Sequence, residues 1–354
     1  VIINAMIKTR IHWDIGTAYD LFISLRILHD PEQYGVRASW AAGVRSRVPA
    51  EFREVLEQTA ELRLIPLPFV HSLKEPKDSK QLLTKMKSMP AGDLLETLAM
   101  RPNIPEDIQD FFQATNASRK WTAEEKQFLI QRWGMGDNKQ TKQLLNTLYK
   151  IWTDRKGFGQ RLLLGLQAYV DTFFAEEEQR ILPVLEQELS YARMRAGSRP
   201  LPAMLEEITA GVRYGDFESL SDIILAPTFW GSPFMFSQHL TDSKMIVLFG
   251  ARPGTMSIIP GDIVPDGLLR GMKAMADSTR LRILRYLAQE PQTAAELSRV
   301  LRLRPPTVNH HLTQLRLAGM VQVYLDSSGE RKFAARYEGF EDTQEMLNRF
   351  VRGD

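Results

Sequence analysis

Residues 305–317 place hydrogen-bonding side chains at intervals that would line one side of a helix. Val308, Leu312 and Leu315 recur at helical spacing and predict the buried side, at about 100° per residue. The opposite side then carries amide, hydroxyl and imidazole groups instead of a row of solvated charges. Groups of these types hydrogen-bond to base edges in the major groove of DNA. The outward residues are Pro306, Thr307, His310, Thr313 and Gln314, with Asn309 at the margin.

Basic side chains surround this segment. Between Arg270 and Arg336 the sequence holds twelve Lys or Arg residues against five Asp or Glu, although the whole chain has a formal net charge of +2. Arg304 precedes the expected helix, and Arg331 and Lys332 follow it in the sequence, so we expect all three to contact phosphates or a groove edge. A compact basic segment attracts the DNA backbone, whereas the plainer alternative is a solvated basic face.

Capping signals define the elements that would position these side chains. Asp277 is a good N-cap for a helix running to residue 288, because its carboxylate accepts free amides of the first turn. Thr293 and Glu296 have the spacing of a capping box for a short helix over 294–301. Gly319 suits the left-handed residue that ends the third helix. The apolar stripes expected for the first two helices are Leu281, Ile283, Leu284 and Leu287, and then Leu297 and Val300.

Two alternating segments, 321–325 and 331–337, predict a hairpin with its loop over 326–330. The order of helix, short helix, tight turn, helix and hairpin is that of a winged helix-turn-helix, whose second helix of the pair enters the major groove. The C-terminal part of the chain is therefore predicted to bind double-stranded DNA.

The same part of the sequence resembles the ArsR family of winged-helix repressors, through residues 274–287, 293–301 and 306–321. The resemblance covers about a fifth of the chain, and it implies that Asn309 and His310 stand where family members read DNA. Two residues depart from the family pattern: Pro305 replaces a frequent Gln, and Arg304 replaces a Ser-type cap. These departures leave the DNA sequence that the chain would recognise open.

The resemblance also raises metal sensing and dimerisation. Family members often bind metal through a Cys-x-Cys pair, but the helix following Thr293 has no cysteine, and residues 338–354 contain no His. We therefore expect no metal and no cofactor. Family members are usually homodimers, which read near-palindromic sites. The expected dimer contacts are Leu268, Met272 and Met275 before the reading segment and Met346, Leu347 and Phe350, together with Phe340, after it.

Composition and length predict a larger N-terminal region. The chain has 354 residues, 44% of them hydrophobic and none of them cysteine, which excludes disulfides and thiolate chemistry. No apolar run is long enough to span a membrane and residues 1–8 lack a secretory signal, so we expect a cytoplasmic bacterial protein. Residues 250–266 hold three glycines and three prolines, and they mark residues 251–266 as a linker between a region at 1–250 and a DNA-binding domain at 267–354.

The N-terminal region reads as a series of amphipathic helices with a few short strands, so the fold class is mainly α with small β elements (α+β). A kink or break is expected at Pro183 within a long helical stretch over 160–195. Residues 13–31 and 222–233 resemble an uncharacterised domain that precedes the winged helix in some bacterial ArsR-type regulators. That resemblance supplies no site.

Three functions for residues 1–250 remain open: sensing a small ligand or partner, dimerisation or protein contacts only, and an enzyme fused to a DNA-binding tail. His12, Trp13 and Asp14 could belong to an active site, but alternation in a strand is the better explanation. The aromatic-rich segment 227–234 is the likeliest ligand site, although large aromatics usually build core. A pocket with a nucleophile and a base would favour the enzyme, and an apolar pocket with a few polar groups would favour sensing.

Overall fold

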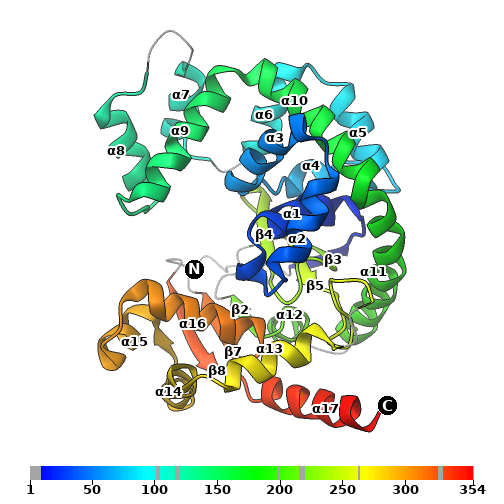
Figure 1. Cartoon of the computed structure of the whole chain (residues 1–354), viewed down its shortest axis with the longest axis vertical. Coiled ribbons are helices and arrows are strands. Elements are labelled where there is room, and N and C mark those ends of the chain that lie inside the picture. Colours follow the sequence, from blue (N-terminus) through cyan, green and yellow to red (C-terminus); the bar gives the residue numbers. More distant parts are fainter. Residues whose placement is uncertain are drawn as a thin grey trace, which may run out of the picture.

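The computed structural model describes residues 9–100, 104–115, 120–197, 200–214, 220–261, 264–325 and 330–353. Helices dominate, with two four-stranded sheets, as expected for a mainly α protein with small β elements. Figure 1 shows the N-terminal helices as an arc, with the C-terminal helices packed below the N-terminal sheet. Among the described residues, no helix is both long enough and apolar enough to cross a membrane.

The N-terminal helices begin where the sequence offers caps. Asp78 accepts a hydrogen bond from the Gln81 amide at the start of α5, and Thr122 and Glu125 form a capping box at α8. The helical elements are α1 (Ala18–His29), η1 (Pro31–Tyr34, a 3₁₀ helix), α2 (Ala38–Arg47), α3 (Ala50–Glu61), α4 (Leu67–His71), α5 (Ser79–Lys87), α6 (Ala91–Ala99), α7 (Glu106–Ala114), α8 (Ala123–Arg132), α9 (Lys139–Thr153), α10 (Arg155–Tyr169), η2 (Val170–Phe174), α11 (Ala175–Ala196) and α12 (Leu201–Ile208).

The long helical stretch departs from the expectation at Pro183. Helix α11 continues through Pro183. The irregular turn of this stretch is η2, a π-helical segment that ends at Phe174, nine residues before the proline. Proline removes one backbone hydrogen bond and crowds the preceding turn, which bends a helix without necessarily ending it. The expected break at Pro183 was therefore wrong, and the alternative of a kink stays a prediction.

The first sheet is buried on both faces. Its order is β1 (Arg10–Trp13), β3 (Asp222–Thr228), β5 (Lys244–Gly250) and β4 (Phe236–Thr241); β1, β3 and β5 run parallel and β4 is antiparallel. Ile224 and Leu248 face the main helical core, whereas Leu225 and Val247 face α11 and α12. Side chains alternate between the two faces of a strand, so burial of both faces explains the continuous apolar run of β3.

A strand from the N-terminal region joins the second sheet. Its order is β2 (Val212–Tyr214), β7 (Val321–Leu325), β8 (Arg331–Ala335) and β6 (Gln292–Thr293), and β2 runs parallel to β7. Residues 251–261 and 264–265 are irregular, as expected of a linker, but Ala251 and Ile258 are buried in the N-terminal core. The division into residues 1–250, 251–266 and 267–354 remains our proposal, with the added fact that the two outer parts share a sheet.

The C-terminal part has the element order that the sequence predicted. Asp277 caps α14 by accepting from the Arg280 amide at 2.8 Å, Thr293 and Glu296 form the capping box of α15, and Gly319 adopts a φ of +70°. The predicted hairpin loop falls mostly on residues 326–329, which lie outside the described residues. The helices are α13 (Asp266–Met275), α14 (Ser278–Leu287), α15 (Ala294–Leu301), α16 (Pro305–Leu317) and α17 (Glu338–Arg352).

Two of the expected inward residues point to solvent. Leu281 is 49% exposed and Val300 is 47% exposed. In the short helix α15, Leu297 and Leu301 stand four residues apart and already fill the inward face, which leaves Val300 beside it. The buried cluster of the C-terminal part is otherwise continuous, from α14 through α16 to the sheet.

Candidate nucleic-acid interface

The first half of α16 presents an open polar face. Val308 is buried, while Pro306, Thr307, Asn309 and His310 are exposed. Asn309 is fully on the open side, not at its margin. Among the described residues, neither Asn309 nor His310 has a side-chain hydrogen bond or ion-pair partner, so their hydrogen-bonding groups are available to an external molecule.

The second half of α16 is covered by the N-terminal region. Thr313 and Gln314 are half-buried, and the Thr313 hydroxyl donates to the Asn309 carbonyl oxygen at 2.9 Å. The Arg316 guanidinium lies 5.4 Å from the centre of the Phe234 ring, in the connection between β3 and β4, and α16 also contacts η1. Of the residues expected to face DNA, the structure therefore leaves Thr313 and Gln314 less accessible, because their turns pack against another part of the chain.

Exposed cations lie on α15, on the turn between α15 and α16, and at the start of β8. The set comprises Arg299, Arg302, Arg304, Arg331 and Lys332, which form no ion pair within the described ranges. Arg302 has a φ of +56° at the end of α15, the left-handed residue of the tight turn. Arg304 occupies the N-cap of α16 without a capping hydrogen bond from its side chain.

Two pKa shifts place the hairpin cations beside these helices. Burial and the positive charge of Arg331 lower the pKa of Arg316 to about 10, which puts Arg331 near the end of α16. Hydrogen bonds from Thr293 lower the pKa of Glu296, and the charge of Lys332 adds to that effect at the start of α15. The first residues of β8 therefore share the neighbourhood of the two helices.

The adjacent histidines occupy different environments. His311 is half-buried, and burial lowers its pKa despite Asp277 at 3.9 Å. It belongs to the packing of the C-terminal part. His310 is exposed on the next position of the helix, with its ring centre 5.9 Å from that of His311.

The helices expected to form a dimer contact pack against each other within the chain. Gly271 of α13 approaches Thr343 of α17 so closely that an added Cβ would lie 2.4 Å from the Thr343 hydroxyl oxygen. Leu268 is only 3% exposed, because the chain's own core covers it, so it offers almost no surface to a partner in this arrangement. Met275, Met346 and Leu347 are half-buried, and the exposed large apolar side chains of the two helices are Leu269, Met272, Phe350 and Val351.

A second polar cluster, missed from the sequence, lies just beyond β1. Asp14 Oδ2 accepts hydrogen bonds from Tyr19 and His71 at 2.7 Å each and from Lys77 at 2.5 Å. Burial raises the pKa of Asp14, but these three donors outweigh it and lower the pKa to about 2. Asp14 and Lys77 are buried, so the cluster ties β1, α1 and the α4–α5 segment together. His71 stands 57 residues away in the sequence, so no local pattern pairs it with Asp14.

The other expected candidates in the N-terminal region are structural. His12 Nε2 lies 2.7 Å from the carboxylate of Asp222, which is the register partner of Arg10 on the neighbouring strand, two positions from that of His12. Trp230 is fully buried, stacked 6.2 Å from Trp40, so most of the segment 227–234 is core. In the described ranges, no group of three or more His, Asp or Glu is arranged to hold a metal ion.

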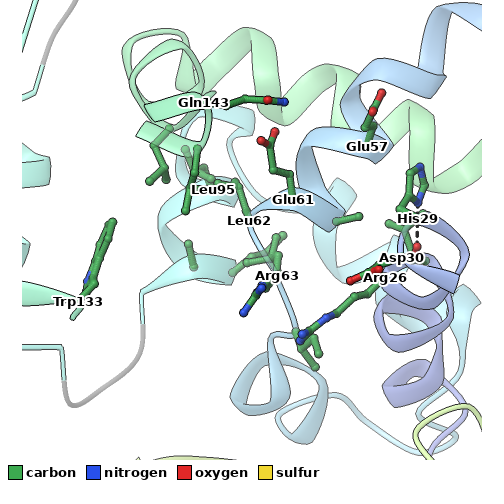
Figure 2. Close-up of a pocket in the computed structure, with 18 of the residues that line it drawn as sticks. Arg26, His29, Asp30, Glu57, Glu61, Leu62, Arg63, Leu95, Trp133 and Gln143 are labelled. Atoms are coloured by element: carbon green, nitrogen blue, oxygen red, sulfur yellow. Dashed lines mark hydrogen bonds between the residues drawn. The ribbon is translucent and has the colours of Figure 1, made fainter. Parts of the chain in front are cut away.

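A cavity of about 1350 Å³ opens among α1, α3, α6, α7 and α9 (Figure 2). Its walls combine apolar side chains, such as Leu56, Leu95 and Trp152, with charged and amide side chains. Of the hydroxyl groups that line it, Thr141 donates to the Gly136 carbonyl oxygen and Tyr169 is bonded to Ser24. A concave site that combines apolar walls with a few polar groups has the composition of a small-molecule site.

Comparison with known families decides the nature of the C-terminal part. Residues 277–323 match the family model described as bacterial regulatory protein, arsR family. These residues are an arsR-family helix-turn-helix domain. The matched range covers α14, α15, α16 and the start of β7, and it includes the open face of α16. The chain thus carries the DNA-binding domain of a transcription regulator. No curated protein and no solved structure matches the chain.

Proposed function

We propose that the protein is a homodimeric, sequence-specific DNA-binding repressor that acts in the bacterial cytoplasm. The observation that carries the proposal is the open first half of α16, where Asn309 and His310 have free hydrogen-bonding groups. Amide side chains pair well with adenine, and imidazole can contact guanine or a phosphate. Arg304 at the start of α16, with Arg331 and Lys332 at the start of β8, adds exposed positive charge for the DNA backbone.

Base readout is assigned to Pro306, Thr307, Asn309 and His310. Thr313 and Gln314 join this set only if the contact between α16 and the N-terminal region opens, since both are half-buried in the present arrangement. A rearrangement of that contact would alter the surface offered to DNA. This contact is therefore the place where a change in the N-terminal region would alter DNA binding.

Dimerisation through α13 and α17 is supported by exposed apolar side chains on both helices. Met272 and Phe350 are about two-fifths exposed and Val351 is 76% exposed. Side chains of this kind gain by leaving water when two copies meet. A two-fold dimer would present two copies of α16 to successive turns of one DNA face.

Ligand sensing is the role we propose for residues 1–250, in preference to catalysis. The apolar cavity supports sensing, since its hydroxyls are engaged within the protein. The buried Asp14 cluster is the strongest alternative for chemistry, but Asp14 has its hydrogen bonds satisfied by three internal donors and little access to solvent. A dimerisation role alone would leave the cavity without a function.

The proposal is tested by selecting duplexes from a random library with the full chain. The full chain is needed because β2 completes the sheet of the C-terminal part. We expect an enriched near-palindrome with half-sites about one helical turn, or a multiple of it, apart. A control selection with His310→Ala should lose preference at one position in each half-site. Absence of any enriched sequence from the wild-type selection would contradict the proposal.

A further inference from the structure

Five arginines line the cavity, and three of them are already occupied. Arg45 and Arg53 donate to backbone carbonyl oxygens, and Arg132 pairs with a carboxylate. Arg26 and Arg63 form no ion pair with any described residue. The cavity therefore has two positive groups that are not neutralised by direct pairing.

Arg26 and Arg63 lie on the same side of the cavity. Figure 2 shows the ends of both labelled side chains turned toward one region, away from Glu57 and Glu61. Arg26 is half-buried, and burial is the main cause that lowers its pKa; the like charge of Arg63 lowers it further, while Tyr34 and Asp30 partly offset the shift. Two guanidinium groups held together in a partly dry site favour an anion between them.

Arg63 also has an unusual backbone. Its φ is +52°, in the left-handed region that glycine and asparagine adopt more readily. Arg302 adopts the same conformation at the end of α15, so the turn after α3 is of a kind that the chain uses elsewhere. The side chain of Arg63 is one of those that line the cavity.

We propose that the cavity binds an amphipathic organic anion, with an apolar body and a carboxylate, sulfonate or phosphate head. The body would lie against the wall that includes Leu95, and the head would contact Arg26 and Arg63. This inference rests on the proposed sensing function for its purpose, but the binding itself does not depend on DNA.

A chain of ring contacts connects this site to α16. The Arg26 guanidinium lies 5.7 Å from the centre of the Tyr34 ring in η1, and Tyr34 meets Phe234 edge to face at 5.5 Å. The Arg316 guanidinium of α16 in turn lies 5.4 Å from the centre of the Phe234 ring. An anion that draws Arg26 from Tyr34 would disturb the contact that covers the second half of α16, so ligand and DNA binding would be coupled.

Two dyes that differ by one sulfonate test the binding site in the full chain. We expect 1-anilinonaphthalene-8-sulfonate to bind, and the Arg26→Met, Arg63→Met double variant to weaken it by about tenfold or more, the scale of one charge-assisted contact. N-phenyl-1-naphthylamine, which lacks the sulfonate, should bind both proteins alike and so report that the cavity is intact. The Arg26→Lys, Arg63→Lys double variant should retain most of the sulfonate affinity.

Two further variants distinguish dye binding in the cavity from adventitious binding at the surface. Ala99 lines the cavity, so Ala99→Trp should fill part of it and weaken the binding of both dyes. Arg193→Met, on the exposed face of α11, should change the affinity of neither dye. Equal loss of both dyes in the double Met variant would overturn the proposal. Sulfonate binding that is insensitive to both the double Met variant and Ala99→Trp would overturn it as well.

The coupling is measured separately with a selected duplex. The sulfonate dye should change DNA affinity, and DNA should change dye affinity by the same factor. Phe234→Leu should preserve dye binding and bring that factor close to one. An unchanged factor in this variant would overturn the connection through Phe234. Failure of DNA binding would refute the proposed function while leaving the dye result intact.

Discussion

Replacing Arg304 by Gln should make DNA binding less sensitive to salt. The side chain is exposed, makes no capping hydrogen bond and pairs with no carboxylate among the described residues, so its loss should not disturb α16. With Arg299, Arg302, Arg331 and Lys332, it provides five cations per subunit. If each contacts one phosphate, a dimer contacts about ten, and the logarithm of the binding constant falls with the logarithm of salt concentration with a slope near −9.

Each phosphate contact contributes about −0.9 to that slope, so Arg304→Gln should make it less steep by about 2 in a dimer. Between 50 and 200 mM salt, a difference of 2 corresponds to roughly tenfold less sensitivity of the affinity. The assay is fluorescence anisotropy of a labelled duplex over a salt series, with Arg193→Gln on α11 as the matched control. An unchanged slope for Arg304→Gln, or an equal change in the control, would refute the assignment of this cation to the interface.

Four further changes have defined outcomes. His310→Ala should weaken binding to the selected site by about 1–3 kcal/mol and leave random duplex nearly unaffected, as read by competition anisotropy; equal losses would make His310 a bystander. Leu312→Ala, at a fully packed core position, should lower the free energy of unfolding by about 2–5 kcal/mol in urea, and a change below the lower value would contradict its burial. For Asp14, whose pKa is about 2 against 3.8 unfolded, about 2 kcal/mol of stability should be lost as the pH falls from about 4 to about 2; Asp14→Asn should lack that loss, and parallel pH profiles would argue against the cluster. The double variant Met272→Glu, Val351→Glu should sediment as a monomer, whereas an unchanged dimer would exclude this face.

The sequence predicted the C-terminal part well because its signals are local. A cap, a capping box and a left-handed glycine each act within a few residues, and the apolar period of α16 needed only one helix to be read. The inward set Val308, Leu312 and Leu315 is buried as expected. Local chemistry thus defined which side of α16 could face outward.

Features that depend on distant contacts could not be predicted. Strand β2 pairs with a strand more than one hundred residues later and has only three residues, so no alternation distinguishes it. Thr313 and Gln314 became half-buried because η1 and Phe234 pack on the end of α16. The hydrogen bond between Asp14 and His71 could not be predicted either, because 57 residues separate them in the sequence.

The cavity was also beyond the reach of sequence patterns. It is built where five amphipathic helices diverge, and each apolar wall residue reads as ordinary core in its own helix. The segment 227–234, expected to be the ligand site, instead contributes Trp230 to the core and Phe234 to the contact with α16. The aromatic residues of this segment thus pack parts of the chain together.

The most direct test of the central claim is photo-crosslinking from α16 to a selected duplex. A benzophenone amino acid replaces Asn309 in one protein and Arg193 in a control, and the crosslinked bases are mapped. We predict crosslinks from position 309 to major-groove bases within each half-site, and none from position 193. Crosslinks from position 193 alone, or none from position 309 in a complex that still forms, would contradict the assignment of α16 as the helix that reads DNA.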